Sequence, residues 1–553
     1  MDSSSRRLRL HHFEEKFKAY SRSGIKILNM LWYLTFALFA VVLYLSLGLK
    51  SQWPDGPRGI PLIGVLPDKK LTLNQQLTNL VPRYGDFFSF NMGRSKVVVL
   101  SSPTAIDDLI IKRGQNYSSR PSSSAQAKII AEGRLIQMEY GDEFRKHRKV
   151  IHSLLGMQNS KIFLPYQEYE SRQTLKNLLQ NPNAFYTEVA RYSASVTFSL
   201  LLGARFASSN TQIPEAIRHI ALDMFEKMRP GHWLADWIPV LNYLPDSLAP
   251  WRADARKTFD NLIGFWSVFY DSITDRMKTG DAPDCFLKRF LESPEINSFS
   301  EVDRRVILSE LLAAGSETTA TTLQWFFKAA VLYPDFIKSA QEELDRVVGP
   351  DRLPQWEDRS KLPYIAATVE EIHRWASVTP LAFFHATSES DSYRGKTIPA
   401  RTTVIYNPSA IHHSSEYFRD HERFVPERFL SEKDPRSLPH YAYAPIHYGF
   451  GAGRRECPGK HVADASLFIV ISRLLWAFNI DLGAHPPPSD DVSGGVPIFR
   501  PVAFACNITP RSKKVADMIL AEAAAQDAAL RVEDAAQYEQ RIMRFVEEQK
   551  VGA

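Results

Sequence analysis

The longest uninterrupted apolar run of the chain lies near its N-terminus. Residues 27–49, ILNMLWYLTFALFAVVLYLSLGL, form a stretch of 23 residues without a charged side chain. At about 1.5 Å of rise per residue, a helix of this length slightly exceeds the roughly 30 Å hydrocarbon core of a bilayer. A buried core helix and a cleaved signal are the alternatives, but the apolar part of a signal is shorter and ends at small residues. Because this run ends at Lys50, the pattern predicts a single-pass transmembrane helix.

Two polar segments flank the apolar run. Residues 1–26 hold seven Lys and Arg against three acidic residues, which makes them a basic N-terminal tail. Residues 50–64 alternate prolines with glycines, a composition that favours a stiff and non-helical linker. We therefore expect a spacer between the membrane and a globular part.

The remaining chain shows mostly helical periodicity. Apolar residues recur at helical spacing from about residue 120 to 380, and alternating β-branched and aromatic residues predict short strands within residues 87–102. No clear linker interrupts residues 65–511, which indicates one large domain. Residues 512–553 are rich in Ala, Glu and Gln and are expected to form a C-terminal helical extension, whose role stays open. The fold class predicted is mainly α with small β-sheets.

Composition and charge narrow the function. The chain is 44% hydrophobic and 23% charged, which is typical of a globular protein, and its formal charge of +5 does not indicate nucleic-acid binding. Three cysteines, Cys285, Cys457 and Cys506, lie too far apart for a disulfide framework or a CxxC zinc site. Cys285 and Cys506 are expected to be small buried hydrophobes, so Cys457 is the remaining candidate for a special task.

The surroundings of Cys457 favour a metal-bound thiolate. The stretch 450–459, FGAGRRECPG, combines glycines that permit a tight loop with two arginines, and an apolar helix follows directly. Backbone N–H groups, cations and a helix N-terminus would each lower the pKa of the thiol. A catalytic nucleophile fits less well, because no local signature supplies a paired histidine.

The same stretch carries a specific resemblance. It is similar to the F-x-x-G-x-R-x-C-x-G haem loop of the cytochrome P-450 family, matching at Phe450, Gly453, Arg455, Cys457 and Gly459. The resemblance implies that Cys457 is the axial ligand of haem iron and that Phe450 packs beside the sulfur. It also implies that Arg455 binds a haem propionate.

A second pair of motifs resembles the structural triad of that family. EEIHR places Glu371 and Arg374 three residues apart on one expected helix, and FVPERF follows with Arg428. An exposed pair at this spacing would contribute little. The resemblance implies instead a buried triad behind the haem loop, in which loss of one member would cost roughly 3–5 kcal/mol.

A third motif resembles the oxygen-binding helix of the family. LLAAGSETTATTLQWFF, residues 311–327, places poor helix formers in mid-helix, where Gly315 leaves room and Thr318 can bond back to the backbone. A helix that merely tolerates polar residues is the alternative. The resemblance implies that Glu317 and Thr318 relay protons during oxygen activation.

A fourth stretch, YGDEFRKHRKVIHSLL at 140–155, resembles the W-R-x-x-R helix of the family with two departures nearby. Phe144 stands where Trp is usual, so one propionate hydrogen bond is lost, while Arg145 and Arg148 keep cationic contacts. His385 stands where an Arg usually meets a propionate, and a protonated His could still donate there.

The resemblance, which covers about residues 52–511, implies haem b and a monooxygenase that uses O2. The chain shows no flavin or nicotinamide fingerprint, so electrons from NADPH are expected through a microsomal NADPH–cytochrome P-450 reductase, with cytochrome b5 as a further candidate donor. A basic face would suit an acidic flavoprotein patch; its candidates are Arg454, Lys460, Arg145 and Lys149.

An apolar, bulky small-molecule substrate is expected. Residues 225–255 resemble fungal members that act in secondary metabolism, such as the O-methylsterigmatocystin oxidoreductase type. The pocket candidates, each equally plausible as core, are Ala313, Val378, Leu381, Ala382, Phe383 and Ile498.

Two rival functions and one conflict stay open at this point. A haem-thiolate isomerase or dehydratase would need neither the proton relay nor a reductase, and a non-enzymatic haem sensor or carrier would form no product. The basic tail favours a cytoplasmic N-terminus, whereas the reductase requires a cytosolic haem domain at the endoplasmic reticulum membrane. Glycan on Asn116 or Asn507, which lie in N-x-[ST] motifs, would place the domain in the lumen instead.

Overall fold

The computed structural model describes most of the chain from residue 52 onward. The described residues are 52–551 without 61–63, 66–67, 69, 93–94, 122–124, 209–211, 230–231, 431–446, 496–497 and 528–532, together with 32–33, 35–37 and 39. The predicted basic tail and most of the predicted transmembrane helix fall outside this set. Within it, no helix combines the length and the apolar character needed to cross a bilayer.

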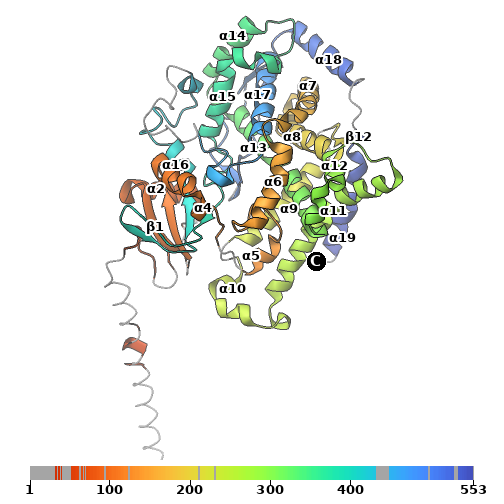
Figure 1. The fold of residues 1–553 in the computed structure, drawn as a ribbon. Helices are drawn as coiled ribbons and strands as arrows, with labels where there is room; N and C mark the ends of the chain where they lie inside the picture. Colours follow the sequence, from red (N-terminus) through yellow and green to blue (C-terminus); the bar gives the residue numbers. More distant parts are fainter. Residues whose placement is uncertain are drawn as a thin grey trace, which may run out of the picture.

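The described chain is mainly helical, as the periodicity predicts, with a small sheet set to one side of the helical body (Figure 1). Long helices form the body, and short ones connect them. The helices are α2 (Leu73–Tyr84), α3 (Pro103–Ile106), α4 (Gly114–Tyr117), α5 (Ala125–Ile130), α6 (Asp142–Leu155), α7 (Leu164–Gln180), α8 (Phe185–Leu202), α9 (Ile213–Met228), α10 (Leu234–Trp237), α11 (Pro250–Thr279), α12 (Phe286–Glu292), α13 (Glu301–Leu332), α14 (Asp335–Val347), α15 (Pro363–Trp375), α16 (Pro408–His412), α17 (Lys460–Ala477), α18 (Lys513–Asp527) and α19 (Ala536–Val551).

The largest described sheet has four strands in the order β1–β2–β7–β4. The expected strands within residues 87–102 are confirmed as an antiparallel hairpin, whose second strand is buried from Val97 to Leu100 because it lies inside the sheet. Four pairs of strands complete the described β structure. The strands are β1 (Phe87–Met92), β2 (Ser95–Leu100), β7 (Thr403–Tyr406) and β4 (His385–Ala386), and the pairs are β9 (Val492–Gly495) with β10 (Ile498–Pro501), β8 (Phe478–Asp481) with β11 (Asn507–Pro510), β3 (Ala204–Arg205) with β12 (Glu533–Asp534), and β5 (Asp391–Tyr393) with β6 (Lys396–Ile398).

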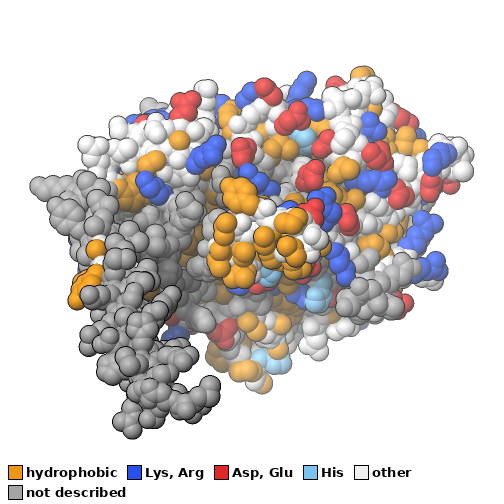
Figure 2. Space-filling model, turned by 90° about the horizontal axis from the view of Figure 1, so that it is seen from below, with side chains coloured by type: hydrophobic (Ala, Val, Ile, Leu, Met, Phe, Trp, Pro, Cys, Tyr) orange, Lys and Arg blue, Asp and Glu red, His pale blue; other side chains and the backbone are white. Residues whose placement is uncertain are grey.

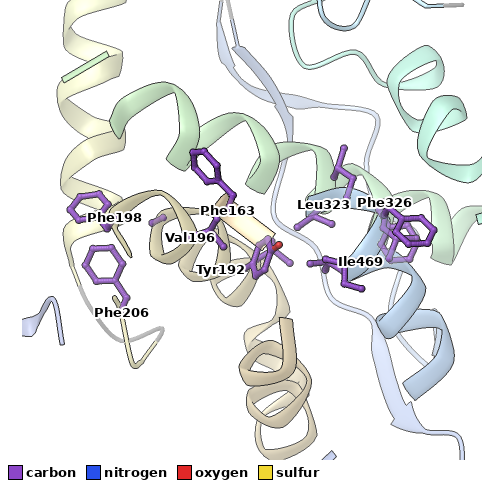
Figure 3. Packing of buried hydrophobic residues seen from close by; sticks show 14 of the residues in the cluster. Phe163, Tyr192, Val196, Phe198, Phe206, Leu323, Phe326 and Ile469 are labelled. Atoms are coloured by element: carbon purple, nitrogen blue, oxygen red, sulfur yellow. The ribbon is translucent and has the colours of Figure 1, made fainter. Parts of the chain in front are cut away.

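The core of the helical body lies where α8, α13 and α17 meet. Helix α13 begins at a capping box in which the Ser300 hydroxyl accepts from the Asp303 N–H at 3.1 Å. From Thr319 to Val331 the helix is buried on all sides, and α13 packs along α8. Figure 3 shows Tyr192, Leu323 and Ile469 from these three helices pointing toward one another. The three helices therefore form a rigid support for residues at the middle of α13 and the start of α17.

The C-terminal extension is docked on this body. Helix α18 packs on α7, β12 pairs in parallel with β3, and α19 packs on α11. Tyr538 and Ile542 of α19 are buried, and the ring of Phe545 occupies the space above Gly264, where an added Cβ would lie 2.8 Å from it. The sequence left the role of this extension open, and the structure shows that it completes the core around α11.

An exposed apolar segment follows α9. Leu234, Ile238, Val240, Tyr243 and Leu248 all expose much of their side chains, although each is a large hydrophobic residue. Helix α10 lies at the lower end of the molecule in Figure 1, and the view from below in Figure 2 shows orange hydrophobic side chains gathered on that face. Large exposed apolar patches on proteins are often interaction sites.

Candidate active site

The Cys457 loop is fixed by its glycines and by its neighbours. Gly451 and Gly453 have φ values of 76° and 67°, which favour glycine, and an added Cβ on Gly453 would lie 2.7 Å from the Ile110 carbonyl oxygen. The Cys457 N–H donates to the Phe450 carbonyl at 2.8 Å, which closes the loop. Helix α17 begins at Lys460, directly after the loop. The thiol is thus held at the start of a buried helix, as the sequence predicts.

The Cys457 side chain is accessible although it is desolvated. Burial raises the pKa of the thiol, while the Gly459 N–H and the Arg148 guanidinium lower it by less. A thiol that is both accessible and desolvated is expected at the wall of an internal space. The local donors and cations lower the pKa as predicted, but the net lowering expected from the sequence is wrong for the chain by itself, because desolvation outweighs them. A bound metal ion would add positive charge that favours the thiolate.

Three buried or half-buried guanidinium groups converge beside this loop. Arg455 donates to the carbonyls of Ser118, Leu135 and Met138, and burial together with its neighbours Arg120 and Arg148 lowers the pKa of Arg455 to about 8. Burial also lowers the pKa of Arg120 to about 10 and that of Arg148 below its usual value.

Among the described residues, none of these three cations pairs with a carboxylate. Buried cations without a counter-charge are costly. A group that carries two carboxylates would supply the missing negative charge, so the donor set of one thiol and three guanidiniums fits haem and its two propionates.

Arg120 is the member of this set that the sequence interpretation missed. Its Nε donates to the Ile136 carbonyl at 2.7 Å, and its Nη1 donates to the carbonyls of Phe383 and Phe384 at 2.9 and 2.8 Å. The signal was its place as a lone cation in the otherwise uncharged stretch NYSSRPSSS. Arg120 lies close to His385, the residue to which the sequence interpretation assigned a propionate contact.

His385 is buried and neutral. Its Nδ1 lies 2.7 Å from the Tyr117 carbonyl oxygen and donates to it, and burial next to Arg120 holds the pKa of His385 well below its usual value. With Nδ1 as the donor, Nε2 of the neutral ring is an acceptor. The suggestion of a protonated, propionate-binding His385 is therefore not supported, since the positive charge at this place comes from Arg120.

The helix α6 carries the two arginines expected to contact the cofactor, and they take different positions. Arg148 points to the Cys457 loop and donates to the Glu456 carbonyl. Arg145 is half-exposed and pairs with Asp142, and no described contact brings it to the arginine cluster. Phe144, at the place of the usual Trp, packs its ring 3.6 Å below the guanidinium carbon of Arg455. Phe144 cannot donate the hydrogen bond that the usual Trp would donate. It instead makes a cation–π contact that positions Arg455.

Helix α13 carries the polar motif around Gly315 and Thr318. Gly315 allows close contact with α8, because an added Cβ would lie 2.6 Å from the Thr197 hydroxyl oxygen. The Thr318 hydroxyl donates to the Ala314 carbonyl at 2.9 Å, as expected, but the helix is continuous and shows no local opening. Ala314 is exposed in the middle of this otherwise central helix. The small Ala314 and the Thr318 hydroxyl thus border accessible space.

Glu317 has a partner that the sequence did not predict. Arg500 on β10 donates through Nη2 to Glu317 Oε2, and both side chains are largely buried. The pKa of Glu317 is thus raised by burial, and Arg500 limits that rise.

The predicted triad is present and fully connected. Glu371 binds Arg374 through two contacts of 2.7 and 2.8 Å and binds Nε of Arg428 at 3.1 Å. The Val425 N–H donates to the same carboxylate at 2.7 Å. The triad joins α15 to the loop around residue 425, and α15 packs directly on α17 behind the cysteine loop.

The predicted pocket residues divide into two groups. Leu381 and Ala382 are buried within hydrophobic clusters next to the small sheet, so they are core residues rather than pocket lining. Val378 is also buried, and its carbonyl accepts from the Phe499 N–H at 2.9 Å. Ala313, Phe383 and Ile498 keep partial exposure, as pocket lining would.

Comparison with known proteins decides the family. The family model described as cytochrome P450 matches residues 54–500. The chain belongs to the cytochrome P450 family. Membership implies haem iron held by a cysteine thiolate, dependence on O2 and an oxidoreductase activity, and the thiol and three guanidiniums described above are suited to that cofactor.

Several curated P450 relatives from fungi are similar over most of their length. Cytochrome P450 monooxygenase polD of Polytolypa hystricis is 35% identical over 497 residues, which cover 87% of this chain and 94% of that protein. Cytochrome P450 monooxygenase verL of Clonostachys rogersoniana is 35% identical over 482 residues, 84% of this chain and 88% of that one. Cytochrome P450 monooxygenase fogE of Aspergillus ruber is 33% identical over 497 residues, 87% and 91% of the two chains.

Proposed function

We propose that this P450 is a haem-thiolate monooxygenase that inserts one oxygen atom of O2 into an apolar small molecule of fungal secondary metabolism. The observation that carries the proposal is the convergence of the accessible Cys457 thiol with three buried or half-buried guanidiniums that pair with no carboxylate of the described residues. The monooxygenase names of the fungal relatives support the same reaction class.

The proposed division of work follows from the positions of the side chains. Haem, when bound, supplies oxygen activation and the oxidising chemistry. Cys457 would hold its iron, while Arg120, Arg148 and Arg455 would bind its propionates and fix its orientation. Phe450, whose ring lies 4.6 Å from that of His373, would shield the sulfur from water.

Glu317 and Thr318 are the proposed proton relay. The Thr318 hydroxyl borders accessible space and can both donate and accept a proton. The Glu317 carboxyl can resupply protons, because its raised pKa lets it change charge nearer to neutral pH than an exposed carboxyl would. Arg500 orients the carboxylate and limits the rise in its pKa. An intact relay favours a monooxygenase over a haem-thiolate isomerase, which needs no protons from it.

We further propose attachment to the endoplasmic reticulum membrane, with the haem domain in the cytosol. Support comes from the apolar run at 27–49, whose described aromatic residues are exposed, and from the exposed apolar segment at 234–248. NADPH–cytochrome P450 reductase would supply electrons at the face that carries Arg454, Lys149 and Lys460, with cytochrome b5 as a further donor. Both asparagines of the N-x-[ST] motifs make hydrogen bonds within the chain. Asn116 accepts from the Glu389 N–H, and Asn507 donates to the Asp481 carboxylate.

One experiment tests the reaction class, and another tests the orientation. Co-expression with a P450 reductase, followed by untargeted product analysis, should reveal an oxidised product that a Cys457→Ser variant does not form. The reduced carbon-monoxide spectrum of the purified chain should show the long-wavelength band of thiolate ligation. NADPH-independent product formation would contradict the monooxygenase proposal, and glycan on either asparagine would contradict the cytosolic orientation.

A further inference from the structure

Two histidines and a glutamate meet in the loop between α16 and the short helix η8 (Pro426–Phe429), the loop whose carbonyls accept from Arg374 of the triad. The stretch is IHHSSEYFRDHER, residues 411–423. One ligand atom each from His413, His421 and Glu422 lies within 4.8 Å of the other two. In the described part of the chain, this is the group of His, Cys, Asp and Glu side chains that meets the spacing of a metal site.

The ring of His413 lies beside the backbone of Trp375 at the end of α15. A hydrogen bond from one ring nitrogen to the Trp375 carbonyl would fix the tautomer of His413, as is usual for a metal-binding histidine. The other nitrogen would then be available to the ion.

His421 and Glu422 provide the second, independent observation. Nδ1 of His421 is shielded from solvent and makes no hydrogen bond to any described residue. Oε1 of Glu422 lies 3.1 Å from this nitrogen, in an orientation unsuited to a hydrogen bond. The Glu422 carboxylate is mostly exposed, so an ion can enter from solvent.

We propose that His413, His421 and Glu422 bind one divalent cation of the zinc type. Two imidazoles and one carboxylate are a ligand set that zinc accepts, with water at the fourth position. With bonds of about 2.0–2.2 Å, neighbouring ligand atoms of a tetrahedral site lie about 3.4 Å apart. The loop therefore has to close only slightly to bind the ion.

The proposed ion would stabilise the loop that surrounds the triad. Arg374 donates to the carbonyls of His412 and His421 at 2.7 and 2.8 Å, and Trp375 donates to that of Glu422 at 3.1 Å. The ion would join the start of this loop to its end and keep these acceptors in place. Because a ligand that binds the folded state alone stabilises it, zinc is expected to raise the unfolding temperature.

The test uses the full-length, haem-loaded P450 in detergent, without a histidine tag. The protein is incubated with zinc chloride, freed of loosely bound metal by gel filtration, and measured for zinc and iron by mass spectrometry. His421→Ala and Glu422→Gln remove ligands while leaving the backbone acceptors of Arg374 and Trp375 intact. Glu416→Gln, an exposed glutamate of the same loop, and His219→Ala, an exposed histidine of α9, are the matched controls.

After gel filtration, the zinc-to-iron ratio of the parent and of both controls should be higher by one than the ratio of either ligand variant. Competition with a chelating dye should show at least about a tenfold loss of affinity in the variants, and zinc should raise the unfolding temperature of the parent but not of the variants. The haem spectra should be unchanged in all five proteins. Equal zinc in the parent and in Glu422→Gln, or no retained zinc in the parent, would overturn the proposal. The exposed Glu422→Gln keeps the test valid even if His421→Ala fails to fold.

Discussion

Arg374 offers a test of how the triad stabilises the fold, because a lysine at this place would keep the charge and change only the geometry. All five N–H donors of Arg374 are used. Two bind the Glu371 carboxylate, and three bind the carbonyls of His412, His421 and Arg423. The side chains of Arg374 and Glu371 are completely buried.

The expected loss of stability in Arg374→Lys follows from these contacts. Lysine has three donors on one nitrogen, so at least two charge-assisted hydrogen bonds disappear, and buried acceptors stay unpaired. At about 1.5–3 kcal/mol for each such bond, the free energy of unfolding should fall by about 3–6 kcal/mol. This is a large fraction of the roughly 5–15 kcal/mol that stabilises a typical domain.

A surface arginine provides the matched control. Arg511 makes the same bidentate contact with Asp345, at 2.9 and 2.6 Å, but this pair is partly exposed. Arg511→Lys should therefore cost less than about 1 kcal/mol. Urea unfolding followed by far-UV circular dichroism measures both variants, and the reduced carbon-monoxide spectrum reports whether thiolate ligation is retained.

The reasoning would be refuted if Arg374→Lys lost no more stability than Arg511→Lys. In that case the positive charge of residue 374, and not the hydrogen-bond geometry of the guanidinium, would explain how the triad stabilises the fold. Glu371→Gln separates the two effects, since it preserves the shape and leaves two buried guanidiniums without a counter-charge. It should cost at least roughly 3 kcal/mol.

Four further outcomes are expected. Thr318→Ala should bind haem normally but divert NADPH-derived electrons to hydrogen peroxide, and a product-to-NADPH ratio equal to the parent's would exclude the relay. Arg500→Leu removes the cation that lowers the pKa of Glu317, so the pH-profile limb that reports Glu317 ionisation should move to higher pH; an unmoved limb would show that another group controls it. His412 is buried and its pKa lies well below 6.5, so the unfolded chain takes up a proton at this residue first as the pH falls. Between pH 6.5 and 5.5 the parent should lose about 1 kcal/mol of stability more than His412→Gln, and identical pH slopes would be inconsistent with a neutral buried ring. Ile542→Ala in the docked α19 should cost about 2–5 kcal/mol, while the exposed Leu520→Ala should cost less than about 0.5 kcal/mol.

Features that depend on local spacing could be predicted from the sequence. The cysteine loop, the pair Glu371 and Arg374, and the β1–β2 hairpin each lie within a short stretch, so turn chemistry and periodicity were sufficient. The family resemblance added Arg428, which no local pattern connects to the other two.

Features that depend on the environment in three dimensions could not be predicted. Arg500 meets Glu317 across 183 residues, and no periodicity brings a strand residue to the middle of a helix. The charge of His385 is set by desolvation and by Arg120, both of which appear only when the chain is folded. The same holds for the raised pKa of Cys457 and for the burial of Leu381 and Ala382.

The place of Phe545 above Gly264 has a consequence for synthesis in the cell. Helix α11 and strand β3 are synthesised well before their partners α19 and β12. Until α19 has been synthesised, the growing chain exposes the apolar face of α11 that α19 later covers, and chaperones bind surfaces of this kind. Termination before α19 would leave that face uncovered, so such a truncated product should be recognised by protein quality control even though the residues proposed to bind haem have already been made.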